Sequence, residues 1–323
     1  MKSFRAFTDD QINEAIITEV LVALGGKPYP KGGHAVILAG GAGSGKGFVL
    51  GKLLAIEGKV FDVDEIKKGI LKHSKLRAEY KKDIQKAIDG KKFPTLTKMP
   101  NLAKRIKDKT LLTDPVFVNI LHQTNRRLGI SQKVENAFFK SLDPKDPKNH
   151  PNVVFDVTLK DVSKLSTITV LLKQHGYDPK NIHLVWVVNS LKNAKKQNKN
   201  VTRGRVVPDD ILLLTHEGAA ETMATILKMS EGIKKYMDGD IWIVPNKMGK
   251  NSRVQKKVIR GDEDKDEKDQ RHAAFFDFFD TYQIKKVGGP IDLSKMMKRI
   301  GDVMNHDLNK ELVADVPSGT FKL

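Results

Sequence analysis

One glycine-rich stretch constrains this sequence more than any other feature. It covers residues 40–47, follows the apolar run 35–39, and precedes an apolar stretch from Phe48 that favours a helix. A strand, a glycine loop, a lysine and a helix in this order form the pattern of a phosphate-binding P-loop. The glycines allow a sharp turn whose N–H groups point into one concavity, and Lys46 adds a full positive charge. The stretch therefore predicts a phosphate site, and the simpler alternative is an ordinary turn between a strand and a helix.

We expect the whole loop to bind a nucleotide, mainly through its backbone. Its residues are Gly40, Gly41, Ala42, Gly43, Ser44, Gly45, Lys46 and Gly47. In the usual pattern a serine or threonine follows the lysine, and its hydroxyl binds Mg²⁺. Gly47 stands at that position here, so the metal needs oxygen ligands from elsewhere. We name Ser44 and Asp156 as the candidate Mg²⁺ ligands.

The composition is that of a globular protein with a strong positive charge. The chain has 57 lysine and arginine residues against 39 acidic ones, which gives a net charge of +18. Such a charge favours polyanionic partners, nucleic acid among them, although a lysine run is often only a solvated face. The lack of cysteine excludes disulfides and thiolate chemistry. Because neither a signal-peptide pattern nor an apolar run of membrane-spanning length is visible, we expect a cytoplasmic protein without membrane contact.

Two acidic residues, Asp62 and Asp64, follow a short apolar run that begins at Val60. In open α/β sheets, ligands bind beyond the carboxyl ends of the strands. We therefore expect both carboxylates at the ligand site, with Asp64 placed to accept the proton of a substrate hydroxyl. The alternative is that Asp64 only caps a helix that begins at Glu65.

A second strand pattern, over residues 152–158, contains Asp156 and ends in Thr158. A carboxylate at a strand end suits Mg²⁺, either directly or through a bound water. The alternative is again a helix cap or a turn residue.

Apolar runs alternate with helical patterns along the chain, which predicts an α/β fold with a parallel sheet flanked by helices. The expected strands cover residues 35–39, 60–63, 152–158, 181–188 and 240–245, with a further edge strand at 282–287. We divide the chain into an N-terminal helical extension (1–30), a core domain (31–247) and a loop-rich C-terminal extension with a terminal helix (248–323). A basic, mainly helical insertion of about residues 70–150 interrupts the core domain.

Two arginines, Arg203 and Arg205, stand in a predicted loop within the segment 195–212, just before a helix that starts near Pro208. Guanidinium groups on such a loop could close over a transferring phosphoryl group and neutralise its charge. Plain solvent exposure of the loop is an equally good explanation from spacing alone.

On these residues the chain resembles the P-loop kinases of the zeta-toxin and polynucleotide 5′-hydroxyl kinase group. The resemblance spans about residues 34–245 and rests on residues 40–47, 61–67, 154–158 and 202–212. It implies a P-loop phosphotransferase that uses ATP or GTP with Mg²⁺ and phosphorylates a hydroxyl. The implied acceptor is a nucleotide sugar or the 5′ end of a nucleic acid.

The resemblance also implies a role for each candidate residue. Asp64 would be the general base. The residues acting on the transferring phosphoryl group would be Lys46, Arg203 and Arg205. The residues on the substrate side would be Asp62, Lys67 and Thr158.

Two residues depart from the family pattern, and the first of them, Gly47, keeps a second class of function open. Gly47 lacks the usual hydroxyl, and Lys67 stands where many members have arginine, which binds phosphate in a bidentate way. The alternative is a nucleotide-dependent nucleic-acid-binding or scaffold protein without kinase activity.

Overall fold

The computed structural model describes eight stretches of the chain: residues 32–50, 58–90, 112–143, 146, 149–189, 191–199, 206–245 and 282–291. They belong to two compact units. The sheet unit consists of Tyr29–Phe61, Asp143–Asn200 and Val207–Leu323. The helical unit consists of Met1–Pro28, Asp62–Leu142 and Val201–Val206. The predicted N-terminal and C-terminal helices lie outside the described residues, and the predicted domain boundaries remain predictions.

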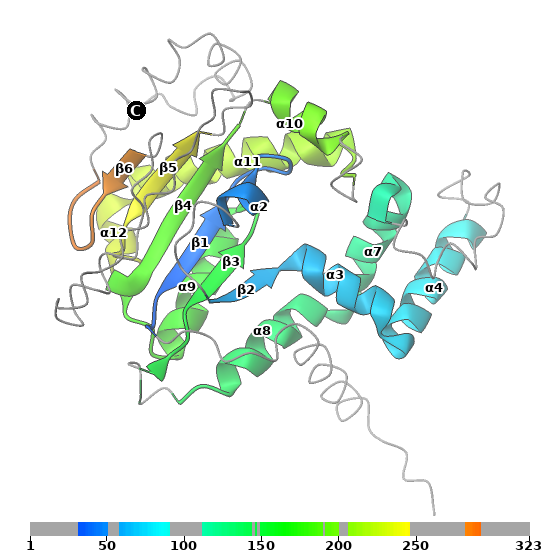
Figure 1. Ribbon diagram of the computed structural model, residues 1–323, viewed down its shortest axis with the longest axis horizontal. Helices are drawn as coiled ribbons and strands as arrows, with labels where there is room; N and C mark the ends of the chain where they lie inside the picture. The colour runs from blue at the N-terminus through cyan, green and yellow to red at the C-terminus, as the bar shows by residue number, and fades with distance from the viewer. Residues whose placement is uncertain are drawn as a thin grey trace, which may run out of the picture. The chain divides into compact units, whose positions relative to one another are not determined.

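The sheet unit is built on a six-stranded, mostly parallel sheet, drawn as arrows in Figure 1. Its strands lie in the order β2-β3-β1-β4-β5-β6. Their bounds are β1 Ala35–Ala39, β2 Lys59–Asp62, β3 Val153–Asp156, β4 Ile182–Val188, β5 Ile241–Pro245 and β6 Tyr282–Lys285. β1 pairs in parallel with β3 and β4, and β4 with β5, whereas β6 is antiparallel to β5. This arrangement confirms the predicted α/β class and the predicted edge strand.

Burial explains why the central strands form. Every residue of β1 is buried, and six of the seven residues of β4 are too, as expected of parallel strands covered on both faces. Alternate residues of the sheet form one apolar cluster, which Val49 joins directly after the glycine loop. The described residues of this unit include the helices α2 Lys46–Phe48, α9 Val162–Gln174, α10 Leu191–Asn198, α11 Asp209–Lys228 and α12 Ser230–Lys234, with a 3₁₀ turn η4 at Pro179–Asn181.

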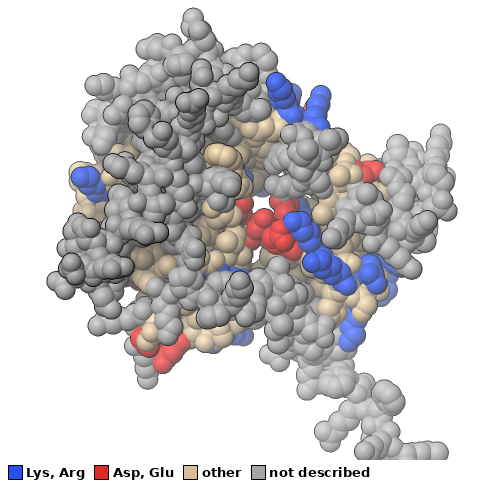
Figure 2. All heavy atoms as spheres, viewed as in Figure 1, with Lys and Arg blue, Asp and Glu red and all other residues tan. Residues whose placement is uncertain are grey.

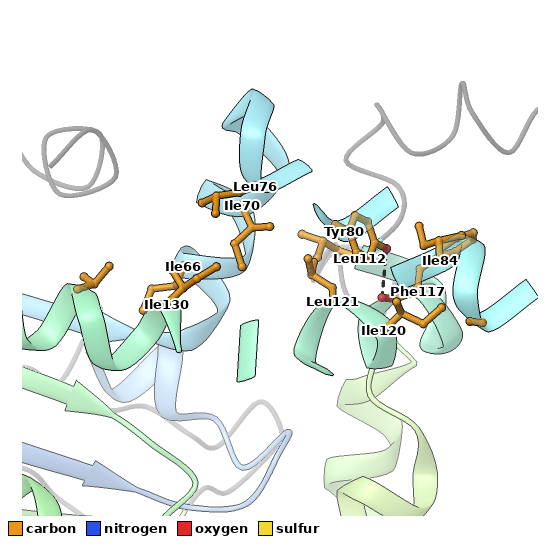
Figure 3. Packing of buried hydrophobic residues seen from close by; sticks show 12 residues of the cluster. Ile66, Ile70, Leu76, Tyr80, Ile84, Leu112, Phe117, Ile120, Leu121 and Ile130 are labelled. Atoms are coloured by element: carbon orange, nitrogen blue, oxygen red, sulfur yellow. Dashed lines mark hydrogen bonds between the residues drawn. The ribbon is translucent and has the colours of Figure 1, made fainter. Parts of the chain in front are cut away.

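Within its described residues, the helical unit has four helices around an apolar core of their own (Figure 3). They are α3 Val63–Lys72, α4 Ser74–Asp89, α7 Pro115–Leu128 and α8 Ile130–Lys140. Tyr80 is fully buried in this core, and its hydroxyl donates to the carbonyl of Phe117 over 3.2 Å. Burial raises the pKa of Tyr80, so the phenol stays protonated. The helical character predicted for this part of the chain is confirmed for the described residues.

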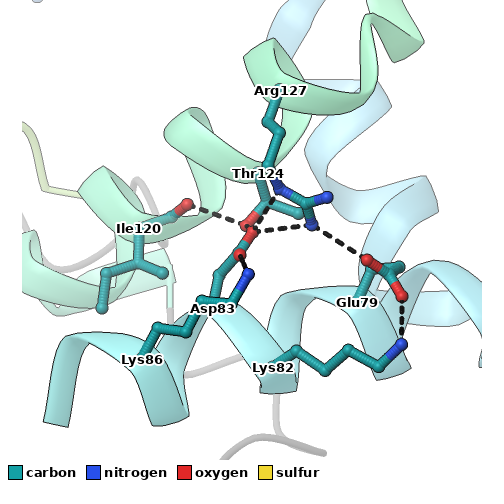
Figure 4. Close-up of polar contacts among 7 residues, drawn as sticks. All are labelled: Glu79, Lys82, Asp83, Lys86, Ile120, Thr124 and Arg127. Carbon is teal, nitrogen blue, oxygen red and sulfur yellow. Dashed lines mark hydrogen bonds and ion pairs between the residues drawn. The ribbon is translucent and has the colours of Figure 1, made fainter. Parts of the chain in front are cut away.

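Polar contacts join α4 to α7 on the surface of the same unit (Figure 4). Arg127 reaches Glu79 and Asp83, each over 3.0 Å, and Asp83 also accepts the hydroxyl of Thr124 over 2.8 Å.

Figure 2 shows acidic side chains gathered where α3 begins, with basic side chains following along α3 and α4. None of the described helices combines the length and the apolar character needed to cross a membrane.

Candidate functional site

The glycine loop follows β1, which lies between β3 and β4 in the sheet. After β1 the chain forms β2 and then β3, which both lie on one side of β1 in the sheet. It then crosses to β4, which lies on the other side of β1. The strand order therefore reverses next to β1, and in open α/β sheets such a switch point is where ligands bind. Figure 1 shows the loop and α2 directly beyond the end of β1.

The backbone of the loop has N–H groups that no other described residue accepts. Gly43 and Gly45 have φ angles of 76° and 102°, which only glycine adopts at little cost. Within the described residues, the N–H groups of these two glycines make no hydrogen bond, whereas the N–H of Ser44 bonds to the carbonyl of Gly41 over 3.1 Å. Unpaired N–H groups in a concave turn are what an anion such as phosphate binds.

Lys46 and Asp156 come together at this loop. The ammonium of Lys46 lies 2.7 Å from the carbonyl oxygen of Gly40 and 3.7 Å from a carboxylate oxygen of Asp156. Both side chains are largely buried, with 12% and 13% of their surface exposed. A cation, a carboxylate and loop N–H groups therefore share one place, which suits a phosphate and a divalent cation.

The other predicted loop and strand-end residues, Ser44, Gly47 and Thr158, differ in exposure. Ser44 is 1% exposed, and its hydroxyl would lie 2.7 Å from a Cβ added at Gly40, so it points inside the loop. A Cβ added at Gly47 would meet nothing within 4 Å. Thr158 follows β3 and is half-buried, and the next residue, Leu159, has a left-handed φ of 49°. Such strain in a non-glycine residue often marks a functional region.

The site thus has N–H groups that could bind a nucleotide's phosphates, but few side chains that could bind a metal ion. No cluster of three or more histidine, aspartate or glutamate side chains suitable for a metal ion occurs among the described residues. Mg²⁺ usually needs only one or two carboxylates, because phosphate oxygens and waters complete its shell. Asp156 fits that requirement.

Asp62, Asp64 and Lys67 belong to the helical unit, at the start of α3. Asp62 caps the helix, because its carboxylate accepts the N–H of Asp64 over 2.8 Å. The helix begins at Val63, so the alternative that Asp64 caps a helix starting at Glu65 is wrong. Asp64 lies in the first turn instead, and its carboxylate is 3.3 Å from the ammonium of Lys67.

Lys67 is an unusual residue because its charged group is buried. The residue is 9% exposed, and burial lowers its pKa, although the charge of Asp62 acts in the opposite direction. Lysine is rarely buried unless its charge is paired, and the carboxylate of Asp64 is the partner here.

Arg203 and Arg205 lie outside the described residues, and their role remains a prediction. Asn198 and Val207, which flank this segment, are joined by two hydrogen bonds. The side-chain nitrogen of Asn198 donates to the carbonyl of Val207 over 2.6 Å, and its side-chain oxygen accepts the N–H of Val207 over 2.8 Å. The helix predicted near Pro208 is confirmed as α11, with Asp209 and Asp210 in its first turn.

Three side chains that hold the loop were not predicted. Asn189, directly after β4, donates to the carbonyl of Gly43 over 3.3 Å. Thr215 and His216, both on α11, bond to the backbone of Ala42. The strand-end position of Asn189 is a signal that could have identified it, whereas nothing in the helical pattern of α11 marks the other two.

Comparisons with known proteins identify similar folds only. No protein-family model matches the sequence, and none of the curated proteins matches it significantly. The structure is similar to a chain from the PezAT chromosomal toxin–antitoxin system of Streptococcus pneumoniae, with 13% identity, a TM-score of 0.42, and coverage of 74% of this chain and 78% of that one. It is also similar to a chain of the AvrRxo1-ORF1:AvrRxo1-ORF2 complex with sulphate ions, with 10% identity, a TM-score of 0.37, and coverage of 76% and 71%. Because both TM-scores lie below 0.5, neither likeness supports an argument about function.

Proposed function

We propose that this protein is a P-loop phosphotransferase that moves the γ-phosphoryl group of ATP or GTP to a hydroxyl acceptor. The observation that carries the proposal is the loop after β1. The N–H groups of Gly43 and Gly45 are unpaired among the described residues, and the ammonium of Lys46 and the carboxylate of Asp156 lie beside the loop. A loop with only N–H groups would bind any anion, but a lysine and a carboxylate together favour a phosphate accompanied by a divalent cation.

In this mechanism the loop N–H groups and Lys46 bind the β- and γ-phosphates. The oxygen of the acceptor hydroxyl bonds to the γ-phosphorus, and Asp64 accepts the proton that this hydroxyl loses. The bond from the γ-phosphorus to the β,γ-bridging oxygen breaks, and the nucleoside diphosphate leaves with that oxygen. Bound Mg²⁺ would be held by Asp156 and would neutralise phosphate charge. Arg203 and Arg205 would stabilise the transferring group.

Lys67 supports the assignment of Asp64. Its ammonium lies 3.3 Å from the Asp64 carboxylate, so an acceptor that reaches Asp64 would bring its negative charge close to a cation. A nucleotide sugar and a nucleic-acid 5′ end both bring phosphate close to the reacting hydroxyl. The proposed acceptor is one of these two classes.

The test is a transfer assay with γ-labelled ATP or GTP, offered in parallel to UDP-sugars and to a 5′-hydroxyl oligonucleotide. We expect label in one acceptor class from the wild type and none from Asp64→Asn, which should still bind the nucleotide. Glu65→Gln is the matched control, because Glu65 is the neighbouring acid, half-exposed and paired with Lys68. An Asp64→Asn variant as active as the wild type would overturn the role of Asp64 as general base.

A second candidate function follows from Gly47 and from the net charge of +18. It is a nucleotide-dependent protein that binds nucleic acid without phosphorylating it. In that case the assay would show nucleotide binding and no label in either acceptor. Oligonucleotide binding would persist and would weaken steeply with salt, because it would depend on counterion release.

A further inference from the structure

Two bonds from α11 fix the backbone of Ala42 in the glycine loop. The hydroxyl oxygen of Thr215 accepts the N–H of Ala42 over 3.0 Å, and Nε2 of His216 donates to its carbonyl over 2.8 Å. Thr215 donates its own proton to the carbonyl of Leu212 over 2.9 Å, so its lone pair is turned towards Ala42. Both polar groups of one loop residue are therefore used by one helix, far away in the sequence.

Packing restricts the same half of the loop. A Cβ added at Gly41 would lie 2.3 Å from the imidazole ring of His216, so the ring covers that glycine directly. A Cβ at Gly43 would lie 2.8 Å from the carbonyl oxygen of Ala194 on α10. Asn189 is 4% exposed and donates to the carbonyl of Gly43. The first half of the loop is thus held by side chains and helices, while the N–H groups of Gly43 and Gly45 stay available for a ligand.

The helix that makes these contacts is itself well anchored. Leu212 and Met223 of α11 are fully buried. Gly218 lies against the backbone after β3, since a Cβ there would be 2.4 Å from the carbonyl of Lys160. Near the start of α11, Val207 is joined to Asn198 of α10 by two hydrogen bonds. These contacts anchor α11 at its start and along its length.

We infer that Thr215 and His216 are positioning residues for the bound nucleotide. They fix Gly41 and Ala42 so that the neighbouring N–H groups stay directed at the phosphates. A loop that is ordered before binding loses less conformational entropy when the ligand arrives. This inference rests on the proposed function, because it assumes that the loop binds a nucleotide.

The test combines amide hydrogen exchange of the loop with nucleotide affinity. Thr215→Val keeps the shape of the side chain and removes the acceptor, whereas Thr215→Ser keeps the hydroxyl. His216→Leu and His216→Gln form the same kind of pair, because a glutamine amide can donate at a similar reach. The matched control is Thr225→Val, on the same helix, whose hydroxyl bonds only within the helix to Glu221 over 3.0 Å.

Thr215→Val should speed exchange at Ala42 and weaken ATP binding about fivefold, the effect of one net hydrogen bond. His216→Leu should act in the same direction, the serine and glutamine variants should restore most of the loss, and Thr225→Val should behave as the wild type. Unfolding temperatures should stay close to that of the control, which separates positioning from general destabilisation.

Two outcomes would overturn the inference, and they are distinguishable from failure of the proposed function. Unchanged exchange at Ala42 in Thr215→Val would show that the contact does not order the loop, whether or not ATP binds. Faster exchange with unchanged ATP affinity would show that the order does not serve the nucleotide. If the wild type binds neither ATP nor GTP, the proposed function itself is wrong, and the nucleotide role of the two residues is wrong with it.

Discussion

The ammonium of Lys46 lies 3.7 Å from the carboxylate of Asp156, although the two residues are far apart in the sequence. They meet because β1 and β3 are parallel neighbours, with Leu38 opposite Asp156 in the register. The loop lysine thereby already has a carboxylate beside it. A metal ion held by Asp156 and a phosphate bound by Lys46 would therefore lie next to each other with little movement of either side chain.

The first prediction concerns Asp156→Asn. The amide keeps the size of the side chain but loses the charge that, on our proposal, would hold Mg²⁺. We expect phosphoryl transfer to fall by about a hundredfold, as for other losses of charge stabilisation at a reacting centre. Half-maximal transfer should also require more Mg²⁺. ATP affinity should change little, because Lys46 and the loop N–H groups remain.

Initial rates over a range of Mg²⁺ concentrations check this expectation. Asp161→Asn is a suitable control, because Asp161 caps α9 and asparagine caps a helix equally well. A variant with the wild-type rate and the wild-type Mg²⁺ dependence would show that Asp156 serves only as a partner of Lys46.

The second prediction concerns Gly47→Ser. The φ angle of Gly47 is not among the positive ones, and a Cβ there would meet nothing within 4 Å. Serine should therefore fit without strain and supply the hydroxyl that the usual P-loop offers to Mg²⁺. We expect normal folding, and half-maximal transfer at a lower Mg²⁺ concentration than in the wild type.

Gly43→Ser is the contrasting variant for this experiment. Its φ of 76° disfavours any side chain, and its Cβ would lie 2.8 Å from the carbonyl of Ala194. We expect it to lose nucleotide binding. Calorimetric titration of both variants with ATP measures the difference, and equal behaviour of the two would mean that local geometry does not limit this loop.

The third prediction separates two roles of Asp62. As the cap of α3 it accepts the N–H of Asp64, which asparagine can also do. Asp62→Ala should lower the free energy of unfolding by about 1 kcal/mol, while Asp62→Asn should leave it nearly unchanged. If Asp62 also binds the acceptor through its charge, Asp62→Asn should raise the KM for the acceptor and leave ATP affinity intact.

Denaturant unfolding and steady-state kinetics on the same two variants decide the matter. An alanine variant as stable as the wild type would rule out the capping role. An asparagine variant with an unchanged KM would rule out the predicted contact with the substrate.

Much of the sheet could be predicted because buried parallel strands are continuous apolar runs. The runs 35–39 and 181–188 correspond closely to β1 and β4. The rule that ligands bind beyond strand ends also predicts Asp156 at the ligand site, and its carboxylate does lie beside Lys46 of the loop. Both results depend on local patterns that are visible in the amino-acid sequence.

The parts that could not be predicted depend on choices the sequence leaves open. Asp62 and Asp64 are both good caps, and only the backbone geometry shows that Asp62 is used. Thr215 and His216 contact the loop because of the way α11 packs across it, which helical periodicity does not reveal. Asn189 follows the same strand-end rule as Asp156 and could have been named.

The last prediction concerns the buried ammonium of Lys67. Burial lowers its pKa, so the folded protein holds this proton less tightly than the unfolded chain does. Between the lowered pKa and the ordinary value of about 10.4, the unfolded state binds more protons, and the free energy of unfolding rises with pH. Below that range the wild type carries the full cost of a buried charge.

Lys67→Met removes this cost and keeps the apolar stem. We expect the variant to be more stable than the wild type by about 1 kcal/mol at pH 7, because the lowered pKa shows that burial costs the Lys67 charge more than the nearby charge of Asp62 returns. The difference should shrink as the pH rises through the lowered pKa of Lys67, because the wild-type amine loses its proton there. Phosphoryl transfer should be lost, because the acceptor's negative charge would have no partner.

Denaturant unfolding at pH 7 and pH 10 measures both parts of this prediction. Lys68→Met is the matched control, because Lys68 is the next residue, half-exposed, and pairs with Glu65 on the surface. A loss of stability in Lys67→Met at pH 7 would mean that the contact with Asp64 outweighs the cost of burial. A gain in stability together with a loss of transfer would mean that the buried charge is retained for function rather than for folding.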